Sequence, residues 1–504
     1  MKEAKRILLI ALTSMLAACS KGGATDIENI AFTRDDINQK SFGGLGVEWG
    51  AYEDTDKLLE NGWETVLKHM DKFAPARVRV MLSYDWFVQN FDNKGTDDKN
   101  DDTWTYNYSN KYAKSTFDIL DYCQTHNVDV AIGAWNVVAY LNEPQKDWGM
   151  TDEVTSDIRW AKLSKDFMDL LINKKGYTCI KWFVNTNEPN WLGTSGSSKN
   201  FNNTYEKWEQ GVKNVRKALD EIGCQHIGII GGDTTGKVGT EEYFTNIANN
   251  IPELVGDYGC HMYVSRRDID LGRLYSTIDT IYKDIKKIDK GLGEERPADV
   301  WEAGILDGKT ALDSQALIDT TSYALGMFDY TIQCLAAGVN GICYWDFDDA
   351  MHFMYLENSV VEKRWGMFSS LADSSSHYQE LRPWYHSSML LTHLFKKGNY
   401  IISPKQNDPA LCETFRSLAT ISKDKKQAGY ALINSGRDDV KRTFVLDEKV
   451  EGDTLYIYNF SDSTYMLGED GYIIPNHIIP GSLNKTLTFD VPKGSAIIVS
   501  NTRL

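Results

Sequence analysis

Two glutamates stand where carboxyl groups can cooperate in chemistry, each at the end of an apolar, strand-like run. Glu188 follows "IKWFVNTN", and Glu302 lies within "DVWEAG". Two neighbouring carboxyl groups can divide the work of a proton donor and a nucleophile. The tripeptide Asn-Glu-Pro that contains Glu188 recurs around Glu143. Glu143, however, stands eight residues beyond Trp135 and is expected on a loop, with a structural role or a place in a distal subsite.

The elements that must position these carboxyl groups are short apolar runs separated by segments with helical spacing, such as "YAKSTFDILDYCQTH". Eight such runs begin at Phe42, Ala76, Val128, Ile180, His226, Tyr258, Ala298 and Asn340. This alternation predicts a (β/α)8 TIM barrel over residues 36–398, with functional groups at the carboxyl ends of the strands. The alternative is an open, doubly wound sheet. Its first strand should lead into a glycine-rich phosphate loop, and "GGLGVEWG" does not.

The pattern changes near residue 399. From there, alternating strand patterns such as "AGYALINS" and "TLYIYNFS" are broken by turns and show no helical period. They predict an antiparallel β-sandwich domain over residues 399–504. The segment "IENIAFTRDD", which overlaps a predicted tether over residues 20–35, is a candidate edge strand of this sandwich.

Residues 1–19 have a basic start, an apolar run too short to span a bilayer, and the ending "LAAC". This ending resembles the lipobox of bacterial lipoproteins, in which Cys19 becomes the lipidated N-terminus. We therefore expect a protein of the cell envelope, anchored by lipid and facing the periplasm or the outside. The alternative is an ordinary signal peptide with a chance cysteine.

Charge and cysteine usage exclude several classes of protein. The formal charge is −17 and no basic run is present, so binding to nucleic acid is not expected. Beyond Cys19 seven cysteines remain, an odd number without the spacing of a zinc site, and most are expected to be buried thiols. We predict no metal and no cofactor.

Further residues at the expected strand ends make a specific resemblance. Asn-Glu-Pro closing the fourth strand and a second glutamate closing the seventh are similar to glycoside hydrolase clan A, the 4/7 superfamily of retaining glycosidases. The matching residues lie in order along the chain: Arg79 in "ARVRVML", Asn187 and Glu188, His261 and Tyr263 in "CHMY", Glu302, and Trp345 in "CYWDF". The resemblance covers about residues 40 to 350.

The resemblance implies a retaining β-glycoside hydrolase, with Glu302 as nucleophile and Glu188 as acid/base. Arg79 and Tyr263 would then bind the Glu302 carboxylate, Asn187 would bind the sugar 2-hydroxyl, and Trp345 would stack on the sugar. For Arg79, pairing with a surface carboxylate is the alternative, and for Tyr263 and Trp345 it is barrel packing. The implied partner is a β-linked glycan, and a neutral one because the protein itself is negative.

Other candidates rest on position alone. His261 is either a substrate contact or a core histidine, and Glu48 in "GVEWG" either binds sugar hydroxyls or is an exposed loop carboxylate. Asp233, Asp346 and Asp348 also stand at strand ends, but none is predicted to be catalytic. Five tryptophans are candidates for a sugar-stacking cleft, with packing as the alternative for some: Trp49, Trp86, Trp104, Trp135 and Trp191. The rival function is a glycan-binding lipoprotein on a barrel that has lost catalysis.

Overall fold

The computed structural model of the 504-residue chain describes residues 28–50, 62–135, 155–190, 204–308, 315–349, 353–356, 359–362, 364–368, 380–404, 414–462 and 464–504. Cys19, Glu143, Trp191 and Cys412 lie outside these ranges. Among the described helices, none has the length and apolar content needed to span a bilayer.

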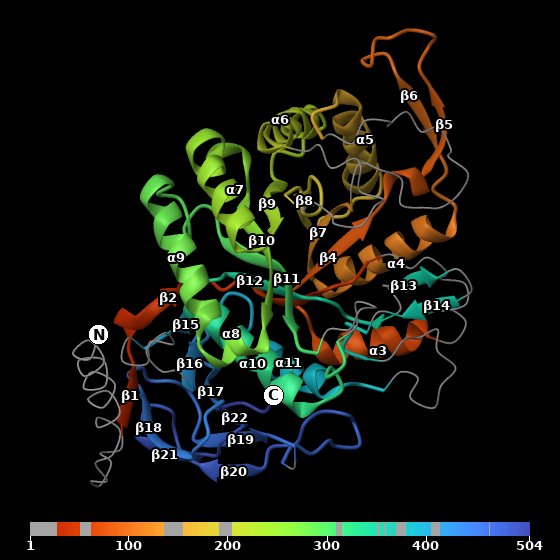
Figure 1. Ribbon diagram of the computed structural model, residues 1–504. Coiled ribbons are helices and arrows are strands. Elements are labelled where there is room, and N and C mark those ends of the chain that lie inside the picture. Colours follow the sequence, from red (N-terminus) through yellow and green to blue (C-terminus); the bar gives the residue numbers. More distant parts are fainter. Residues whose placement is uncertain are drawn as a thin grey trace, which may run out of the picture.

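A closed barrel of eight parallel strands forms the larger part of the molecule (Figure 1). Its strands are β3 (Gly44–Glu48), β4 (Arg77–Leu82), β7 (Asp129–Ala134), β8 (Ile180–Val184), β9 (Gly228–Thr235), β10 (Asp257–Ser265), β11 (Ala298–Leu306) and β12 (Gly341–Tyr344). All eight coincide with the predicted apolar runs. The runs are continuous because every residue of strands such as β4 and β7 is buried, with side chains facing either the barrel interior or the helices. The barrel prediction is confirmed.

Helices follow the strands and cover the outside of the barrel. They are α3 (Trp63–Phe73), α4 (Lys111–His126), α5 (Ile158–Met168), α6 (Tyr205–Glu221), α7 (Lys237–Asn250), α8 (Arg266–Asp270), α9 (Arg273–Ile288), α10 (Thr321–Ala336) and α11 (Pro383–Leu394). Local signals fix the ends of α4: the Asn110 side chain accepts a hydrogen bond from the Ala113 N–H, and Asn127 ends the helix in the left-handed conformation.

The C-terminal domain is an antiparallel sandwich, as predicted. One sheet has the order β2 (Ile37–Gln39), β15 (Tyr400–Ile402), β16 (Phe415–Ile421), β17 (Ala428–Asn434), β22 (Ser495–Ser500), β19 (Thr454–Phe460) and β20 (His477–Pro480). The other has β1 (Glu28–Phe32), β18 (Val440–Leu446) and β21 (Leu487–Val491).

The N-terminal strands correct the predicted boundaries. Strand β1 lies inside the predicted tether but pairs in parallel with β18, which confirms the candidate edge strand. Strand β2 lies inside the predicted barrel range but pairs with β15 of the sandwich. The apolar side chains of Ile30 and Phe32 in β1 are buried in the sandwich core, and this burial explains why the segment is a strand of the sandwich and not a tether.

The barrel and the sandwich share a buried interface through α10. Nearly all of α10 is buried, because the barrel covers one side and β16 and β17 cover the other. A buried ion pair crosses the interface, in which Arg416 of β16 donates to Asp329 of α10 at 2.6 Å. The sandwich is therefore fixed to the side of the barrel below α10 and α11 in Figure 1.

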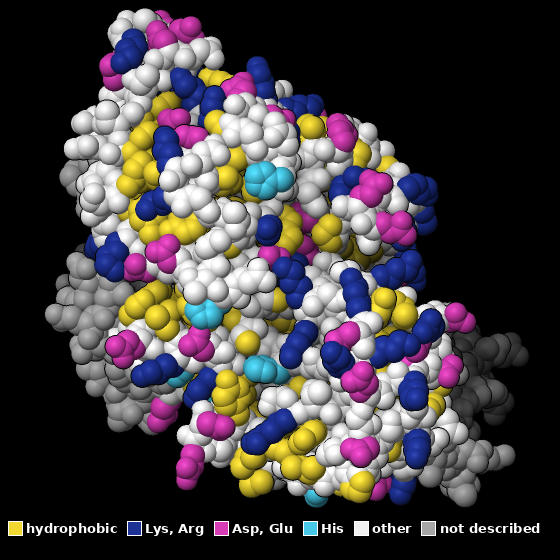
Figure 2. All heavy atoms as spheres, turned by 180° about the vertical axis from the view of Figure 1, so that it is seen from behind, with side chains coloured by type: hydrophobic (Ala, Val, Ile, Leu, Met, Phe, Trp, Pro, Cys, Tyr) yellow, Lys and Arg dark blue, Asp and Glu magenta, His cyan; other side chains and the backbone are white. Residues whose placement is uncertain are grey.

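Two hairpins extend from the barrel. The Asp- and Asn-rich insertion after β4 forms β5 (Val88–Asp92) and β6 (Thr103–Tyr106), which project from the molecule (Figure 1). Strands β13 (Phe353–Leu356) and β14 (Ser359–Glu362) pair after β12. On the face seen in Figure 2, basic and acidic side chains are interspersed, in keeping with the absence of a basic run.

Candidate active site

The barrel brings the predicted residues to the carboxyl ends of its strands. Adjacent strands place Glu48 of β3 beside Arg79 of β4, and His261 of β10 beside Glu302 of β11. Glu188 follows the end of β8, where its backbone N–H donates to the Asp233 carbonyl at 3.0 Å. The positive φ of Glu188, 42°, turns the chain there.

Glu188 and Glu302 are close to each other. One oxygen of each carboxyl group and one nitrogen of His261 all lie within 4.8 Å of one another. The Glu302 side chain is 5% exposed and that of Glu188 is 17% exposed, so Glu188 is the more accessible of the two. At this separation one substrate atom can lie within reach of both carboxyl groups.

Arg79 is fully buried and binds four groups at once. One guanidinium nitrogen, Nη1, donates to Glu302 Oε1 at 2.7 Å and to Glu48 Oε2 at 3.0 Å. The other, Nη2, donates to Asn187 Oδ1 at 2.7 Å and to Asp233 Oδ2 at 2.8 Å. The alternative of a surface ion pair is therefore wrong for Arg79. The bond to Asn187 also fixes the orientation of the Asn187 amide, since only its oxygen can accept.

The Glu302 carboxylate has one further donor and one ion-pair neighbour. The Tyr263 hydroxyl donates to Glu302 Oε2 at 2.7 Å, and His261 Nδ1 lies 3.4 Å from the same oxygen. Burial raises the pKa of Glu302 above its ordinary value, while the charges of His261 and Arg79 act against this rise. Gly304 is required beside this contact, because a Cβ there would meet the Tyr263 ring at 2.8 Å.

His261 is completely buried and both of its ring nitrogens contact carboxyl groups. Nδ1 lies 3.0 Å from Glu188 Oε1, and Nε2 lies 3.0 Å from Asp233 Oδ1. Burial lowers the pKa of His261, but the charges of Glu302 and Asp233 outweigh it and raise that pKa to about 10. The predicted choice was between a substrate contact and a core histidine. The structure agrees with the core histidine, since the ring is buried and both nitrogens have partners, and it adds that one partner is the Glu188 carboxyl group.

Asp233 is the site residue to which sequence reasoning gave no role. Strict alternation along β9 from Ile230, which faces the barrel interior, places the Asp233 side chain outside. A bulge reverses this orientation: Gly232 pairs with Gly259, Thr234 pairs with Cys260, and Asp233 is the extra residue between them. The signal in the sequence was the pair of glycines before Asp233, since glycine inside a strand often marks a bulge.

Glu48 departs from both of its predicted readings. It is 0% exposed, and its Oε2 accepts from Arg79, so it is not a loop carboxylate at the surface. Burial raises the pKa of Glu48 to about 8, and the nearby charge of Arg79 opposes the rise. Its place beside Arg79 makes it part of the charge network beneath the site.

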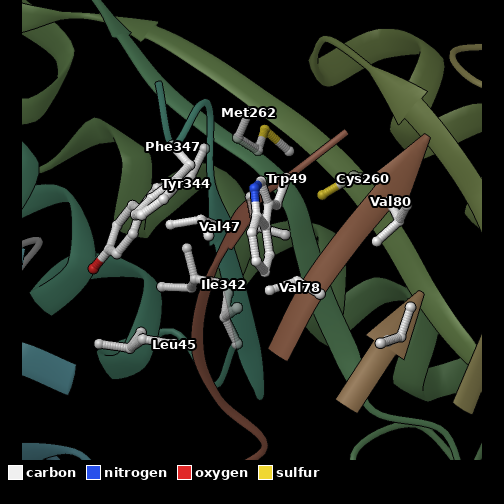
Figure 3. Packing of buried hydrophobic residues seen from close by; sticks show 14 of the residues in the cluster. Leu45, Val47, Trp49, Val78, Val80, Cys260, Met262, Ile342, Tyr344 and Phe347 are labelled. Atoms are coloured by element: carbon white, nitrogen blue, oxygen red, sulfur yellow. The ribbon is translucent and has the colours of Figure 1, made fainter. Parts of the chain in front are cut away.

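The tryptophans divide between the cleft and the core. Trp135 and Trp345 lie at the carboxyl ends of β7 and β12 with their rings 5.8 Å apart in an edge-to-face arrangement. Trp49, predicted for the cleft, is instead fully buried among apolar side chains and stacks on Trp63 (Figure 3). The period of the strand explains the error, because Trp49 follows Glu48 and so points to the opposite side, toward the helices.

Trp86 and Trp104 belong to the region of the projecting hairpin. Trp86 stacks on Tyr112 of α4, and Trp104 of β6 packs against Phe91 of β5. These contacts serve packing within the insertion.

Three donor atoms, from Glu188, His261 and Glu302, are close enough together to suit a metal ion. Hydrogen bonding accounts for their closeness, because both nitrogens of His261 lie at hydrogen-bond distance from carboxyl oxygens, those of Glu188 and Asp233. We therefore interpret the cluster as a site for proton chemistry. The described cysteines are buried free thiols, as predicted: Cys123, Cys179, Cys224, Cys260, Cys334 and Cys343.

Comparison with known proteins gives structural neighbours with low sequence identity. A glycoside hydrolase family 30 subfamily 8 xylanase from Clostridium acetobutylicum has a TM-score of 0.60 at 11% identity, covering 94% of this chain and 99% of that one. An endo-β-1,6-glucanase has a TM-score of 0.60 at 13% identity, covering 95% and 96%. A family 51 α-L-arabinofuranosidase from Bifidobacterium longum has a TM-score of 0.59 at 12% identity, covering 95% and 100%.

The chain has the fold of clan A glycoside hydrolases. The neighbours cover nearly the whole chain, so the fold they share includes the β-sandwich as well as the barrel. No family model and no curated protein sequence matches the chain. The likeness therefore lies in the three-dimensional arrangement.

Proposed function

We propose that the protein is a retaining β-glycoside hydrolase that cleaves a β-linked, neutral oligo- or polysaccharide by double displacement. The observation that carries this proposal is the approach of Glu188 and Glu302 to within 4.8 Å. Retaining enzymes hold their two carboxyl groups about 5–5.5 Å apart, whereas inverting enzymes separate them by about 6.5–9.5 Å to admit a water molecule.

In the first step Glu302 attacks the anomeric carbon and Glu188 gives its proton to the departing oxygen. The carbon–oxygen bond of the glycoside breaks as the ester bond to Glu302 forms. Arg79 and Tyr263 donate to the two oxygens of Glu302 and hold it as a carboxylate with the attacking oxygen fixed in place. The leaving glycan departs as a neutral alcohol.

In the second step Glu188, now a carboxylate, removes a proton from water. The resulting hydroxide equivalent attacks the anomeric carbon from the side that the leaving group vacated, and Glu302 is released as a carboxylate. Two inversions at the same carbon give overall retention. The greater exposure of Glu188, 17% against 5% for Glu302, suits the residue that must meet both leaving group and water.

The substrate class follows from groups around the two glutamates. Asn187 has its amide oxygen held by Arg79, which leaves its amide NH2 group as the donor to a sugar hydroxyl. Trp135 is partly exposed and packs edge-to-face with the buried Trp345, so its ring is the one that can stack on a sugar. The formal charge of −17 favours a neutral glycan over an acidic one.

The rival function is glycan binding without catalysis on the same barrel. A barrel that had lost catalysis would be expected to lack one of the reacting carboxyl groups or its supporting donors. Glu188, Glu302, Arg79 and Tyr263 are all present and joined by hydrogen bonds, which favours the enzyme.

We also propose that the mature chain is anchored through a lipid on Cys19 to a membrane of the cell envelope. Cys19→Ala should then yield a protein that leaves the membrane fraction and keeps its activity, because the barrel does not depend on the anchor. Continued partitioning of the variant into membranes would contradict the anchor.

The experiment that tests the function is a screen of the mature protein against β-linked oligosaccharides, followed by proton NMR of the first product formed. We expect hydrolysis of at least one neutral glycan, with the β-anomer appearing first. Early formation of the α-anomer, or binding without any hydrolysis across the panel, would contradict the proposal.

A further inference from the structure

Asp233 joins the three parts of the site that surround Glu188. Its side chain is buried, with Oδ1 3.0 Å from His261 Nε2 and Oδ2 2.8 Å from Arg79 Nη2. Its backbone carbonyl accepts the N–H of Glu188 at 3.0 Å. Asp233 therefore contacts both His261, whose ring faces Glu188, and the backbone N–H of Glu188.

The backbone conformation at Asp233 directs its side chain into the barrel. The residue is the extra one of the β9 bulge and has a φ of 52°, which is uncommon for a residue other than glycine. Gly232, with a φ of 108°, precedes it. Bulges next to active sites re-aim side chains, and here the bulge turns a carboxylate from the helix layer into the barrel.

We propose that Asp233 is a positioning residue that keeps His261 doubly protonated, with its Nδ1–H directed at Glu188 and Glu302. This role rests on the proposed function, since it gives Glu188 and Glu302 their parts as acid/base and nucleophile. Asp233 itself touches no reacting atom and acts through His261.

The hydrogen-bond inventory supports the charged ring. A carboxylate accepts and does not donate, so Asp233 requires a proton on Nε2, and a carboxylate at Glu188 or Glu302 requires one on Nδ1. The charged groups facing the ring come from five elements: Asp233 on β9, Glu188 after β8, Glu302 on β11, Glu48 on β3 and Arg79 on β4. Of the carboxyl groups, the charges of Glu302 and Asp233 contribute most to favouring the cation. Arg79 and His261 in turn lower the pKa of Asp233, against the effect of its burial.

A single charged His261 serves both chemical steps. Its Nδ1 is hydrogen-bonded to Glu188 Oε1 at 3.0 Å, and Glu302 Oε2 lies 3.4 Å from the same nitrogen, within the distance of an ion pair. Before attack the negative charge is on Glu302. After glycosylation Glu302 is an ester and the negative charge is on Glu188, which has given up its proton. The Nδ1–H bond follows the charge, and His261 neither gains nor loses a proton.

The test uses Asp233→Asn, which keeps the shape of the side chain and a residue type that tolerates positive φ. The ring nitrogens of His261 are followed by NMR in the ¹⁵N-histidine-labelled protein, with the signal assigned through His261→Gln. We expect the wild-type ring to stay charged at about pH 8.5, and the ring of Asp233→Asn to have lost its proton by about that pH.

The pH profile supplies a second readout. At the acidic limb of kcat/KM the His261 ring is charged in both proteins, and Asp233→Asn removes a negative charge near Glu302, so this limb should move to lower pH; activity lost with the cation should appear toward pH 8.5. We expect kcat to fall about 10–100-fold with KM little changed, as is typical when the partner of a functional histidine is removed.

Asp329→Asn is the matched control. Asp329 is also buried and also accepts from two side chains, Arg416 at 2.6 Å and Gln333 at 3.0 Å, but it lies on α10 at the sandwich interface. Its substitution should cost stability and leave both the His261 titration and the acidic limb unchanged.

A wild-type ring that is neutral at pH 8.5, a ring that stays charged in Asp233→Asn, or an equal change in Asp329→Asn would overturn the proposal. Its failure is distinguishable from that of the proposed function, because the NMR titration needs no substrate. Glycan hydrolysis with a neutral His261 in the wild type would overturn the role of Asp233 alone. The expected titration in a protein that cleaves no glycan would overturn the proposed function.

Discussion

Two arginines on β4, Arg77 and Arg79, both point into the barrel, because side chains two residues apart lie on the same face of a strand. Both are buried, yet their surroundings differ. The Arg77 guanidinium lies between the rings of Trp182 and Trp301, 4.9 and 5.0 Å from their centroids, with Asp299 at 3.2 Å. Arg79, one level nearer the carboxyl ends of the strands, binds polar groups from β3, β9 and β11 and the segment after β8.

The difference shows how one residue type can serve as packing at one level and as part of a site at the next. Arg77 is enclosed: a Cβ at Gly341 would fall 2.0 Å from its guanidinium, so even a methyl group has no space there. Arg79 lies beside Glu188 and Glu302, whose side chains retain some exposure to solvent. We infer that the lower layer stabilises the barrel and that the upper layer performs the reaction.

Glu188→Ala should have the largest effect of the variants that sharpen this contrast. Without a proton donor, cleavage of natural glycans should fall about 10²–10⁴-fold. Glycosylation by an aryl glycoside with a good leaving group should suffer much less, since that step needs little protonation. Burst and steady-state rates on both substrates separate the two effects.

Glu143→Ala is the control for Glu188→Ala, because it changes the other Asn-Glu-Pro, which stands eight residues beyond Trp135 in the sequence rather than at a strand end. Its turnover of the aryl substrate should stay close to that of the wild type. A folded Glu143→Ala protein as inactive as Glu188→Ala would show that the wrong glutamate has been chosen.

Arg79→Lys and Arg77→Lys compare the two layers directly. A lysine at position 79 cannot bind all four partners, and we expect kcat/KM to fall about 10²-fold. Lysine at position 77 loses the stacked, planar contact, so the free energy of unfolding should fall by about 3 kcal/mol while the folded protein keeps its kcat within about threefold. Kinetics and urea denaturation of both variants give the comparison. If Arg77→Lys and Arg79→Lys lost activity equally, the proposed difference between the stabilising layer and the reacting layer would be wrong.

Glu48→Gln should have the smallest effect, on the pH dependence of stability. The pKa of Glu48 is about 8 in the folded protein against an ordinary 4.5, so the folded state holds this proton more tightly. The Glu48 proton therefore makes its full contribution to the free energy of unfolding below about pH 4.5, and that contribution is lost as pH rises through about 8. The pKa of His261 is raised from 6.5 to about 10, so its proton also stabilises the folded protein, and this stabilisation is lost at higher pH.

The free energy of unfolding of the wild type should thus fall from about pH 5 to about pH 8, and Glu48→Gln should fall less. Urea denaturation at several pH values in this range measures both slopes. A steeper fall in the variant would contradict the assignment of the proton to Glu48.

The sequence predicted the barrel because its signals are local. Each apolar run fills a strand that is buried on both faces, and helical spacing separates the runs. The pairing of β1 with β18 joins residues more than 400 positions apart, as in Glu28 with Arg442. Strand composition suggested that β1 is an edge strand, but it did not identify β18 as the neighbouring strand. That pairing is set by the burial of Ile30 and Phe32 in the core of the sandwich.

The site was predictable where residue type and order carried the information, as for Arg79, Glu188, Tyr263 and Glu302. It was not predictable where backbone irregularity decides direction. Asp233 faces the barrel because of the β9 bulge, which a count of alternating residues cannot reveal. Trp49 was misplaced for a related reason, since its neighbour Glu48 has the inward position.

The most direct test of the account is to trap the covalent intermediate. Once the screen has identified the sugar, the matching 2-deoxy-2-fluoro glycoside with a good leaving group should accumulate as a glycosyl ester, because the fluorine slows both steps while the good leaving group speeds the formation of the ester alone. Peptide mass spectrometry of the labelled protein locates the ester. We expect the label on Glu302 and none on Glu302→Gln, whereas a label on Glu188 or Glu48 in the wild-type protein would contradict the assignment of the nucleophile.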